Sequence, residues 1–402
     1  MKTSQYSRSV RLVAAATLSC TAASALLGAC ASDENATLDI PDTTVTLAPE
    51  DDAGSTEASA DTGACASDDC EYFPTACAPD AMCPSGLFNT QDPTRGLDWR
   101  THINVVTGRS ASDVWYAGTA GAVGHFDGVS WKASDVGTRE TQDILWFLGS
   151  AEVLIGRRNA PNRIYARGLE VDAGTPVSEG GWSRQPSIAA AAELWELTAA
   201  WSWPGSTTLW VGTTNEVWRV RRTPEATFEP SQAISSSVCR AVGCRSLRSL
   251  HGASSDIIWG VGDIGATVRI TSSGGSTPSA TPVESNTWVG LRGVWAASDT
   301  NVWAVGGAGT VLHYTGDALG WEQVQGVPTS VNLNAIWGTS PSDIWAVGDA
   351  SVVLHYDGAR WTRIHVAGLG DRRPALTTVW TPEPGRVWAG GDGILLALGE
   401  TQ

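Results

Sequence analysis

An internal repeat constrains the fold of this chain more than any other feature of its sequence. The stretch Asn334-Ala-Ile-Trp-Gly-Thr-Ser-Pro-Ser-Asp-Ile-Trp-Ala-Val-Gly348 recurs as Arg292-Gly-Val-Trp-Ala-Ala-Ser-Asp-Thr-Asn-Val-Trp-Ala-Val-Gly306. A short apolar run, a Gly turn and another Trp follow each copy. The apolar runs are rich in β-branched and aromatic residues and are bounded by Gly, Asp and Ser, which is typical of short antiparallel strands.

Two positions of the repeat can be followed through seven copies. The first is occupied by Thr107, Trp146, Trp201, His251, Trp295, Trp337 and Trp380. The second is occupied by Trp115, Leu154, Trp210, Trp259, Trp303, Trp345 and Trp388. Successive copies of the second position lie 45.5 residues apart on average. Repeats of this length, built from four short strands, are typical of propeller blades. The sequence therefore predicts an all-β fold, a seven-bladed β-propeller over residues 95–402.

A third position is expected on the outer strand of each blade. It is occupied by Trp131, Trp182, Phe228, Trp288, Trp321 and Trp361. The seventh copy has room for only three strands before Gln402, whereas residues 96–101, which contain Trp99, resemble residues 358–363 around Trp361. We therefore expect an N-terminal strand, residues 96–101, to complete the last blade and so to remove an exposed sheet edge.

The repeat also explains most of the aromatic composition. The chain has 20 Trp residues, and 17 of them fall on these positions or on the related residue Trp99. Each of His125, His313 and His355 stands ten residues after the second position of its copy. Recurrence at one strand position predicts a shared hydrogen bond inside the blade rather than a metal site.

The N-terminus has the pattern of an export signal. A basic segment ending at Arg11 precedes an apolar run from Leu12 to Leu27, and small residues then lead to Cys30. This order is typical of a secretory signal peptide, here residues 1–30. Leu27-Gly28-Ala29-Cys30 resembles the lipobox of bacterial lipoproteins, which implies that Cys30 is acylated. The protein is then expected to be lipid-anchored outside the cytoplasm in the bacterial cell envelope, at the outer membrane or cell surface.

The negative charge is concentrated behind this signal. The chain has a net charge of −16, and residues 31–94 carry fourteen acidic groups and no basic group. Residues 31–62 have almost no large apolar side chain, which predicts a disordered acidic linker. A nucleic-acid partner is not expected, because that would require clustered Lys and Arg.

Six of the eight Cys remain after the signal peptide and the lipidated residue are set aside. They are Cys65, Cys70, Cys77, Cys83, Cys239 and Cys244. An even number in an exported chain predicts disulfides. Cys239 and Cys244 are expected to pair, whereas the four in the Cys-rich segment 63–94 allow three pairings. Their spacing disfavours the alternative of a zinc site.

A family resemblance supports the fold. Asp343-Ile-Trp-Ala-Val-Gly-Asp349, followed by Val353-Leu-His-Tyr-Asp-Gly358 and Trp361, resembles the seven-bladed propellers of the BNR and photosystem II stability/assembly-factor-like class. The resemblance implies the fold, whereas function depends on the site. The Asp box of sialidases is not reproduced, because Asp357 and Gly358 are adjacent and Trp361 follows the Asp by four residues.

Copies two to four depart most from the repeat and supply the candidate ligand-binding residues. These are Arg157, Arg158 and Arg163 in one loop, and Trp195, Trp203 and Trp218, which lie outside the repeat positions. The arginines would suit an anionic ligand, and the tryptophans would stack on sugars. The alternative interpretations are that the arginines lie in a solvated loop and that the tryptophans fill the propeller core.

The function predicted from these features is a membrane-tethered binding or interaction module for glycans or envelope proteins. The alternatives are a carbohydrate-active enzyme, either a glycoside hydrolase or a polysaccharide lyase, and an envelope assembly scaffold. The sequence contains no nucleophile elbow, HExxH motif or phosphate-binding glycine loop. We therefore assign no catalytic residue, metal or cofactor.

Overall fold

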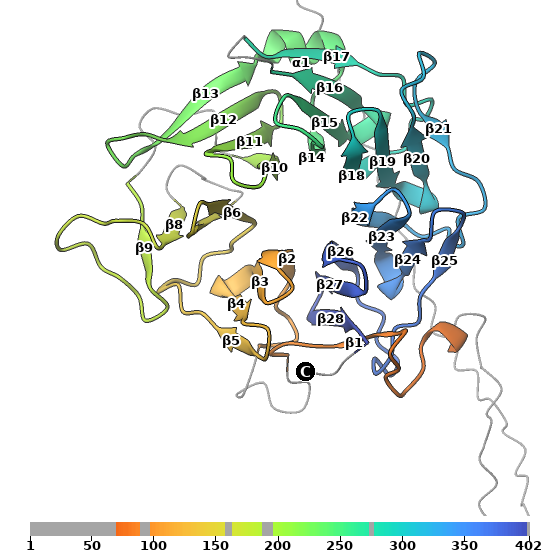
Figure 1. The fold of residues 1–402 in the computed structure, drawn as a ribbon, viewed down its shortest axis with the longest axis horizontal. Coiled ribbons are helices and arrows are strands. Elements are labelled where there is room, and N and C mark those ends of the chain that lie inside the picture. The colour runs from red at the N-terminus through yellow and green to blue at the C-terminus, as the bar shows by residue number, and fades with distance from the viewer. Residues whose placement is uncertain (1–69, 89–96, 157–162, 187–195, 273–276, 400–402) are drawn as a thin grey trace, which may run out of the picture. The chain divides into compact units, whose positions relative to one another are not determined.

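Seven four-stranded antiparallel sheets form a ring, and the space that their innermost strands surround is here called the channel (Figure 1). The computed structural model describes residues 70–88, 97–156, 163–186, 196–272 and 277–399. The predicted seven-bladed β-propeller is therefore confirmed. In each blade the first strand lies nearest the channel and the fourth lies at the periphery.

The blades follow one another along the chain, and within each blade the strands are ordered from the channel outwards. Blades one and two comprise β2 (Ile103–Ser110), β3 (Asp113–Gly118), β4 (Val123–Phe126) and β5 (Trp131–Ala133), then β6 (Ile144–Leu148), β7 (Ala151–Ile155), β8 (Ile164–Arg167) and β9 (Trp182–Arg184). Blades three and four comprise β10 (Leu197–Trp201), β11 (Thr208–Thr213), β12 (Val217–Arg222) and β13 (Phe228–Ile234), then β14 (Leu247–His251), β15 (Ile257–Gly262), β16 (Thr267–Thr271) and β17 (Ser279–Pro282).

The remaining three blades complete the ring. Blades five and six comprise β18 (Leu291–Ser298), β19 (Asn301–Gly306), β20 (Val311–Tyr314) and β21 (Glu322–Gln323), then β22 (Leu333–Ser340), β23 (Asp343–Gly348), β24 (Val353–Tyr356) and β25 (Trp361–Arg363). Blade seven comprises β26 (Leu376–Glu383), β27 (Arg386–Gly391), β28 (Ile394–Leu398) and β1 (Met82–Pro84). A single α-helix in the described residues, α1 (Ser236–Val242), links blades three and four.

The second strands are buried on both faces because neighbouring blades pack against one another. In β3, β11, β15, β19 and β23 the last five residues of each strand are buried. The sequence of a strand that is covered on both faces is a continuous apolar run, without alternation of apolar and polar residues. The Ile-Trp-Ala-Val pattern of the repeat therefore reflects packing between blades.

The core is divided among the blade interfaces. Each of the seven interfaces encloses its own cluster of buried apolar residues, including the interface between blades seven and one. Tryptophans of the repeat lie in these clusters, as with Trp303 and Trp361 between blades five and six. The hydrophobic stabilisation of the ring therefore depends on the stacking of all seven blades.

The two aromatic positions of the repeat are cross-strand partners. Trp295 faces Trp303 and Trp337 faces Trp345, and the same register holds in every blade except the second. There the register is shifted, so that Trp146 faces Val153. In blade six a glycine, Gly338, follows the first position because Trp295 of blade five packs closely against it. A β-carbon on Gly338 would lie 2.9 Å from the Trp295 ring.

An N-terminal strand closes the ring, as predicted, but the residues predicted for it are wrong. The closing strand is β1, in which Met82 faces Leu398 and Pro84 faces Leu396 of β28. Met82 is fully buried, whereas Trp99, in the predicted segment 96–101, is 56% exposed. The Cys-rich segment therefore supplies a strand of the propeller in addition to preceding it. An edge strand tolerates Pro84 because its outer side needs no ladder hydrogen bond.

First-position side chains of blades three to six gather around His251. The rings of His251 in blade four and Trp337 in blade six lie 5.1 Å apart, although blade five separates their strands. Trp201 and Trp295 lie within 6.4 Å of the same imidazole. These four aromatic side chains therefore form one cluster on the inner side of blades three to six.

Two disulfides are present in the described residues. Cys239 pairs with Cys244, as predicted, and the bond is buried between blades three and four. Cys77 pairs with Cys83, which selects one pairing for two of the four cysteines in the Cys-rich segment. Cys65 lies outside the described residues, and the side chain of Cys70 is not among those described.

Candidate functional site

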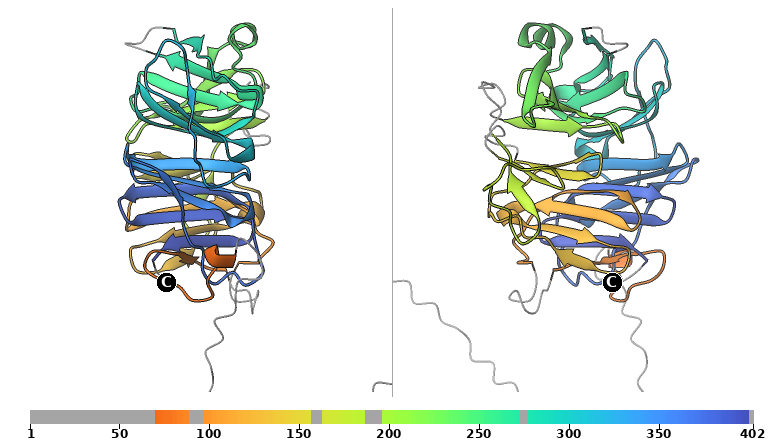
Figure 2. Two further views of the ribbon diagram at one scale, coloured as in Figure 1. Left: turned by 90° about the vertical axis from the view of Figure 1, so that its right-hand side faces the viewer. Right: turned by 60° about the vertical axis from the view of Figure 1, so that its left-hand side comes forward.

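The ring has two faces that differ in the loops they carry. Strands cross the thickness of the ring, and loops lie at both faces (Figure 2). One face, here called the connection face, carries the loops between second and third strands and the connections from blade to blade. The other, the hairpin face, carries the loops between first and second strands and between third and fourth strands. The two faces offer separate surfaces for binding.

The recurring histidines belong to an internal hydrogen-bonded set at the hairpin face. In blade one, Asp113 Oδ1 accepts hydrogen bonds from Trp115 Nε1 at 2.8 Å and from His125 Nε2 at 2.9 Å. The imidazole stacks on the indole with ring centroids 4.2 Å apart. The same arrangement holds for Asn301, Trp303 and His313 in blade five and for Asp343, Trp345 and His355 in blade six. The predicted shared hydrogen bond is therefore confirmed.

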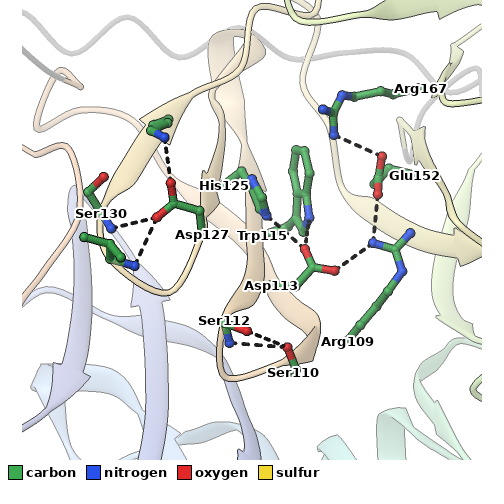
Figure 3. Close-up of polar contacts among 12 residues, drawn as sticks. Arg109, Ser110, Ser112, Asp113, Trp115, His125, Asp127, Ser130, Glu152 and Arg167 are labelled. Atoms are coloured by element: carbon green, nitrogen blue, oxygen red, sulfur yellow. Dashed lines mark hydrogen bonds and ion pairs between the residues drawn. The ribbon is translucent and has the colours of Figure 1, made fainter.

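In blade one this set extends into an ion-pair network with blade two (Figure 3). Arg109 Nη1 lies 3.0 Å from Asp113 Oδ2 and 2.8 Å from Glu152 Oε1, and Arg167 Nη1 lies 3.3 Å from Glu152 Oε2. Burial alone would raise the pKa of Asp113, but hydrogen bonds from Arg109, Trp115 and His125 outweigh it and hold this pKa below its ordinary value. Because Glu152 is buried and has two cationic partners, we interpret the network as structural.

The connection face carries a polar rim around the channel between blades four and seven. Arg248 forms a bidentate pair with Asp263, with Nε 2.9 Å from Oδ1 and Nη2 2.7 Å from Oδ2. Arg292 Nη1 donates to Asn334 Oδ1 at 2.6 Å, and Asn334 Nδ2 donates to Asp349 Oδ1 at 2.8 Å. Arg292 is exposed and has no carboxylate partner among the described residues. The rim therefore presents one neutralised and one available guanidinium.

Two large apolar side chains protrude beside this rim. Trp288 is 86% exposed and Ile264 is 69% exposed. The loops that carry them touch, because a β-carbon on Gly265 would lie 2.0 Å from the carbonyl oxygen of Thr287. The repeat predicts Trp288 on the outer strand of blade four, and this prediction is wrong because β17 ends at Pro282. The side chain lies instead in the connection from β17 to β18.

Ile264 also adopts an unfavourable backbone conformation. Its φ is 56° and its ψ is 41°, in the left-handed region that a β-branched residue rarely enters. The equivalent turns of blades one, five and six place Ala120, Ala308 and Ala350 in the same conformation. Non-glycine residues in this region cost on the order of 1–3 kcal/mol and concentrate at functional sites. The strained and exposed Ile, in place of Ala, therefore identifies this loop as a candidate functional site.

Of the six residues predicted from the sequence as ligand-binding, the three that the structure describes lie apart from one another. Arg157, Arg158 and Trp195 lie outside the described residues. Arg163 lies 3.6 Å from Glu140 in an ion pair at the connection face. Trp218 is buried between blades two and three, and its Nε1 donates to Glu216 Oε2. Trp203 is 38% exposed but lies in the β10–β11 loop, at the hairpin face.

Among the residues that the structure describes, neither the cavity found nor any cluster of metal-binding side chains offers a stronger candidate. A cavity lined by Ser85, Phe126 and Trp388 has a volume of about 30 Å³, which is enough for one water molecule. Within the described ranges no group of three or more His, Cys, Asp or Glu could hold a metal ion. In the same ranges no helix has the length and apolar character needed to cross a membrane. The surface beside the rim is thus the strongest candidate site.

Fold and site together define a β-propeller whose exposed apolar and cationic side chains lie beside the channel mouth. Solved structures with the same ring architecture are similar to it. YCF48 bound to D1 peptide superposes with a TM-score of 0.56 at 15% identity, over 82% of this chain and 99% of that chain. YCF48 from Cyanidioschyzon merolae gives a TM-score of 0.55 at 16% identity, over 74% of this chain and 96% of that chain.

A third similar structure is an extracellular domain. It belongs to a putative hybrid two-component system of B. thetaiotaomicron and has a TM-score of 0.55 at 12% identity, over 79% of this chain and 42% of that chain. No protein-family model matches the sequence, and a search of curated protein sequences finds no relative. At these identities the similarity shows the fold alone.

Sequence reasoning missed Ile264 and misplaced Trp288. The turn Asp263-Ile264-Gly265 aligns with Gly307-Ala308-Gly309 and Asp349-Ala350-Ser351. A β-branched residue at a position where three other copies have Ala is a visible departure from the repeat. Its meaning depends on a positive φ, which the sequence does not state.

Proposed function

We propose that this protein is a docking module that binds a segment of another polypeptide at its connection face, beside the channel mouth of blades four to six. The observation that carries the proposal is the pair of exposed side chains Trp288 and Ile264. Trp and Arg are the residues most enriched at the energetic centres of protein interfaces. Arg292 lies on the same face beside the neutralised Arg248–Asp263 pair, so an apolar anchor and one cationic group are available to one partner.

The strain at Ile264 supports a binding role over a purely structural one. A buried Ile would contribute to the core, but this side chain is mostly exposed and contributes little there. Ala occupies the same conformation in three other blades without the added β-branched side chain. The backbone conformation of Ile264 costs free energy and exposes an apolar side chain. This is consistent with a favourable contact that the side chain makes only when a partner is bound.

The comparisons are consistent with a polypeptide partner and an extracytoplasmic location. YCF48 has been solved with a D1 peptide, and the B. thetaiotaomicron propellers are extracellular domains. We extend these properties to this chain as part of the proposal. The signal peptide, the acylated Cys30 and the acidic linker 31–62 would then hold the propeller at the envelope membrane by a flexible tether.

Site-specific photo-crosslinking tests the proposal. A benzophenone amino acid replaces Trp288 in one version of the chain and Leu319 in a matched control. Leu319 is 82% exposed but lies between β20 and β21, at the hairpin face. We expect a defined polypeptide adduct in cells from position 288 and none from 319. Equal labelling at both positions, or labelling of glycan alone, would contradict the proposal.

A further inference from the structure

Blade three repeats the geometry of the Asp–Trp–His set at the hairpin face but changes its chemistry. Trp210 faces Arg219 across the ladder, in the register in which Trp115 faces His125. Thr208 stands two residues before Trp210, where blades one and six have Asp113 and Asp343. Blade three therefore keeps the indole, replaces the imidazole with a guanidinium and lacks the carboxylate that would accept from both.

The donors left in blade three are not satisfied by the described part of the chain. The guanidinium of Arg219 lies 5.6 Å from the Trp210 ring centroid, and its Nε is buried without a hydrogen-bond partner. The Trp210 indole N–H donates to no acceptor in the described ranges. Arg221 follows on the same side of β12, and its Nε donates to Thr208 Oγ1 at 2.9 Å.

Two neighbouring arginines place positive charge around these donors. No ion pair between described residues involves Arg219 or Arg221. Glu229 lies opposite Arg221 in the ladder without pairing with it. Burial, and after it the charge of Arg221, lower the pKa of Arg219. An added carboxylate would offset both effects.

Blade four shows why blade three is distinctive. Arg269 faces Trp259 there in the same register. The position of the carboxylate is taken by Ile257, an apolar side chain that packs against the cluster between blades four and five. Blade three instead has the short hydroxyl of Thr208 at this position, and so retains polar partners for a ligand.

We propose that blade three binds the carboxylate of an Asp or Glu side chain from a partner polypeptide, in the place that Asp113 and Asp343 fill in their own blades. Trp210 is buried and Arg219 is partly buried, so the carboxylate must arrive on a slender stem. An Asp side chain, with one methylene, has the shape that blades one and six already enclose. A uronic acid is disfavoured because its carboxylate is attached directly to a sugar ring.

Trp203 gives the flanking residues of such a partner a surface to contact. It follows Ser202, whose hydroxyl donates to the carbonyl oxygen of Thr208 at 2.9 Å. The site lies on the hairpin face, opposite the surface assigned under the proposed function, and goes beyond it. Variants of Trp288 test docking at the connection face, and variants of Arg219 test carboxylate binding at the hairpin face, so one proposal can fail without the other.

Calorimetric titration of the full chain with acetyl-Ala-Asp-Ala-amide tests this site. The Asn peptide of the same length and sodium glucuronate are the comparison ligands. Arg219→Gln removes the main donor, and Thr208→Asp supplies a carboxylate from the chain itself. Arg269→Gln is the matched control, because it removes the equivalent guanidinium of blade four.

We expect Arg219→Gln, Thr208→Asp and the Asn peptide each to weaken binding by about tenfold or more, the usual effect of losing a charged hydrogen bond. Arg269→Gln should bind as the unmodified protein does. Thr208→Asp should melt no lower than the unmodified protein, which shows that its loss of binding is not unfolding. Unchanged affinity in Arg219→Gln or Thr208→Asp, or an equal loss in Arg269→Gln, would overturn the proposal. Tighter binding of glucuronate than of the Asp peptide would overturn the polypeptide assignment.

Discussion

The imidazole of His251 is buried among the aromatic rings of neighbouring blades, and this makes the fold sensitive to acid. Burial lowers the pKa of His251 from 6.5 to about 3. Its Nδ1 accepts a hydrogen bond from the Ala296 backbone N–H at 3.1 Å, so the folded state holds the neutral ring with its proton on Nε2. Protonation would place a charge in the core and remove this acceptor.

The sign and size of the effect follow from these two pKa values. Between pH 6.5 and 3 the unfolded chain binds a proton at His251 that the folded chain does not bind. The free energy of unfolding therefore falls as the pH falls, by up to about 1.4 kcal/mol per pH unit. From pH 7.5 to pH 5 the loss from this residue is about 2 kcal/mol. This loss of stability depends only on the pKa of His251 in the unfolded chain, because its pKa in the folded chain lies well below 5.

Urea unfolding at the two pH values, followed by tryptophan fluorescence, measures this loss. His251→Gln keeps an acceptor for Ala296 and does not titrate, so it should lose about 2 kcal/mol less than the unmodified protein on acidification. His365→Gln is the control, because His365 is exposed. It should show the same loss as the unmodified protein. If His251→Gln loses as much stability between pH 7.5 and 5 as the unmodified protein does, the assignment of acid sensitivity to this imidazole is refuted.

Three further predictions concern the turn at Ile264, the ring closure and the lipid anchor. Ile264→Gly should raise the free energy of unfolding by about 1 kcal/mol, because glycine relieves the left-handed strain, and should weaken partner binding. Ile264→Ala should weaken binding with a smaller gain in stability. A chain that begins at residue 86 lacks β1 and should be less stable by about 3 kcal/mol or more than one that begins at residue 63, since it loses the buried Met82. Equal melting of the two chains would refute closure by β1. Cys30→Ser should release the protein from membranes, and unchanged membrane fractionation would refute lipidation.

The fold was predictable from the sequence where the repeat has a direct structural cause. Trp295 and Trp303 recur eight residues apart because they face each other across a two-strand ladder. His125, His313 and His355 recur because each stacks on its Trp and shares one acceptor with it. Contacts within one blade fix the spacing of these residues along the chain, so the contacts can be predicted from that spacing.

Features that depend on contacts between distant segments were not predictable in the same way. The strand β1 has only three residues, one of them Pro, and carries no alternation that would mark it. Its position is set by the burial of Met82 beside blade six residues such as Trp345 and Val347. Trp288 matched the spacing of the outer strand, but that strand ends earlier in blade four. The candidate site was missed for a different reason, because the positive φ of Ile264 is a property of the folded turn that residue identity does not state.

The affinity of the crosslinked partner for variants at the two faces tests the central claim most directly. The segment identified by crosslinking at position 288 is titrated into the unmodified protein, Trp288→Ala and Leu319→Ala. If the connection face is the docking surface, Trp288→Ala should weaken binding by about thirtyfold or more, the effect of removing an interface hot spot. Leu319→Ala should leave the affinity unchanged. Equal affinities for all three proteins would contradict docking at Trp288.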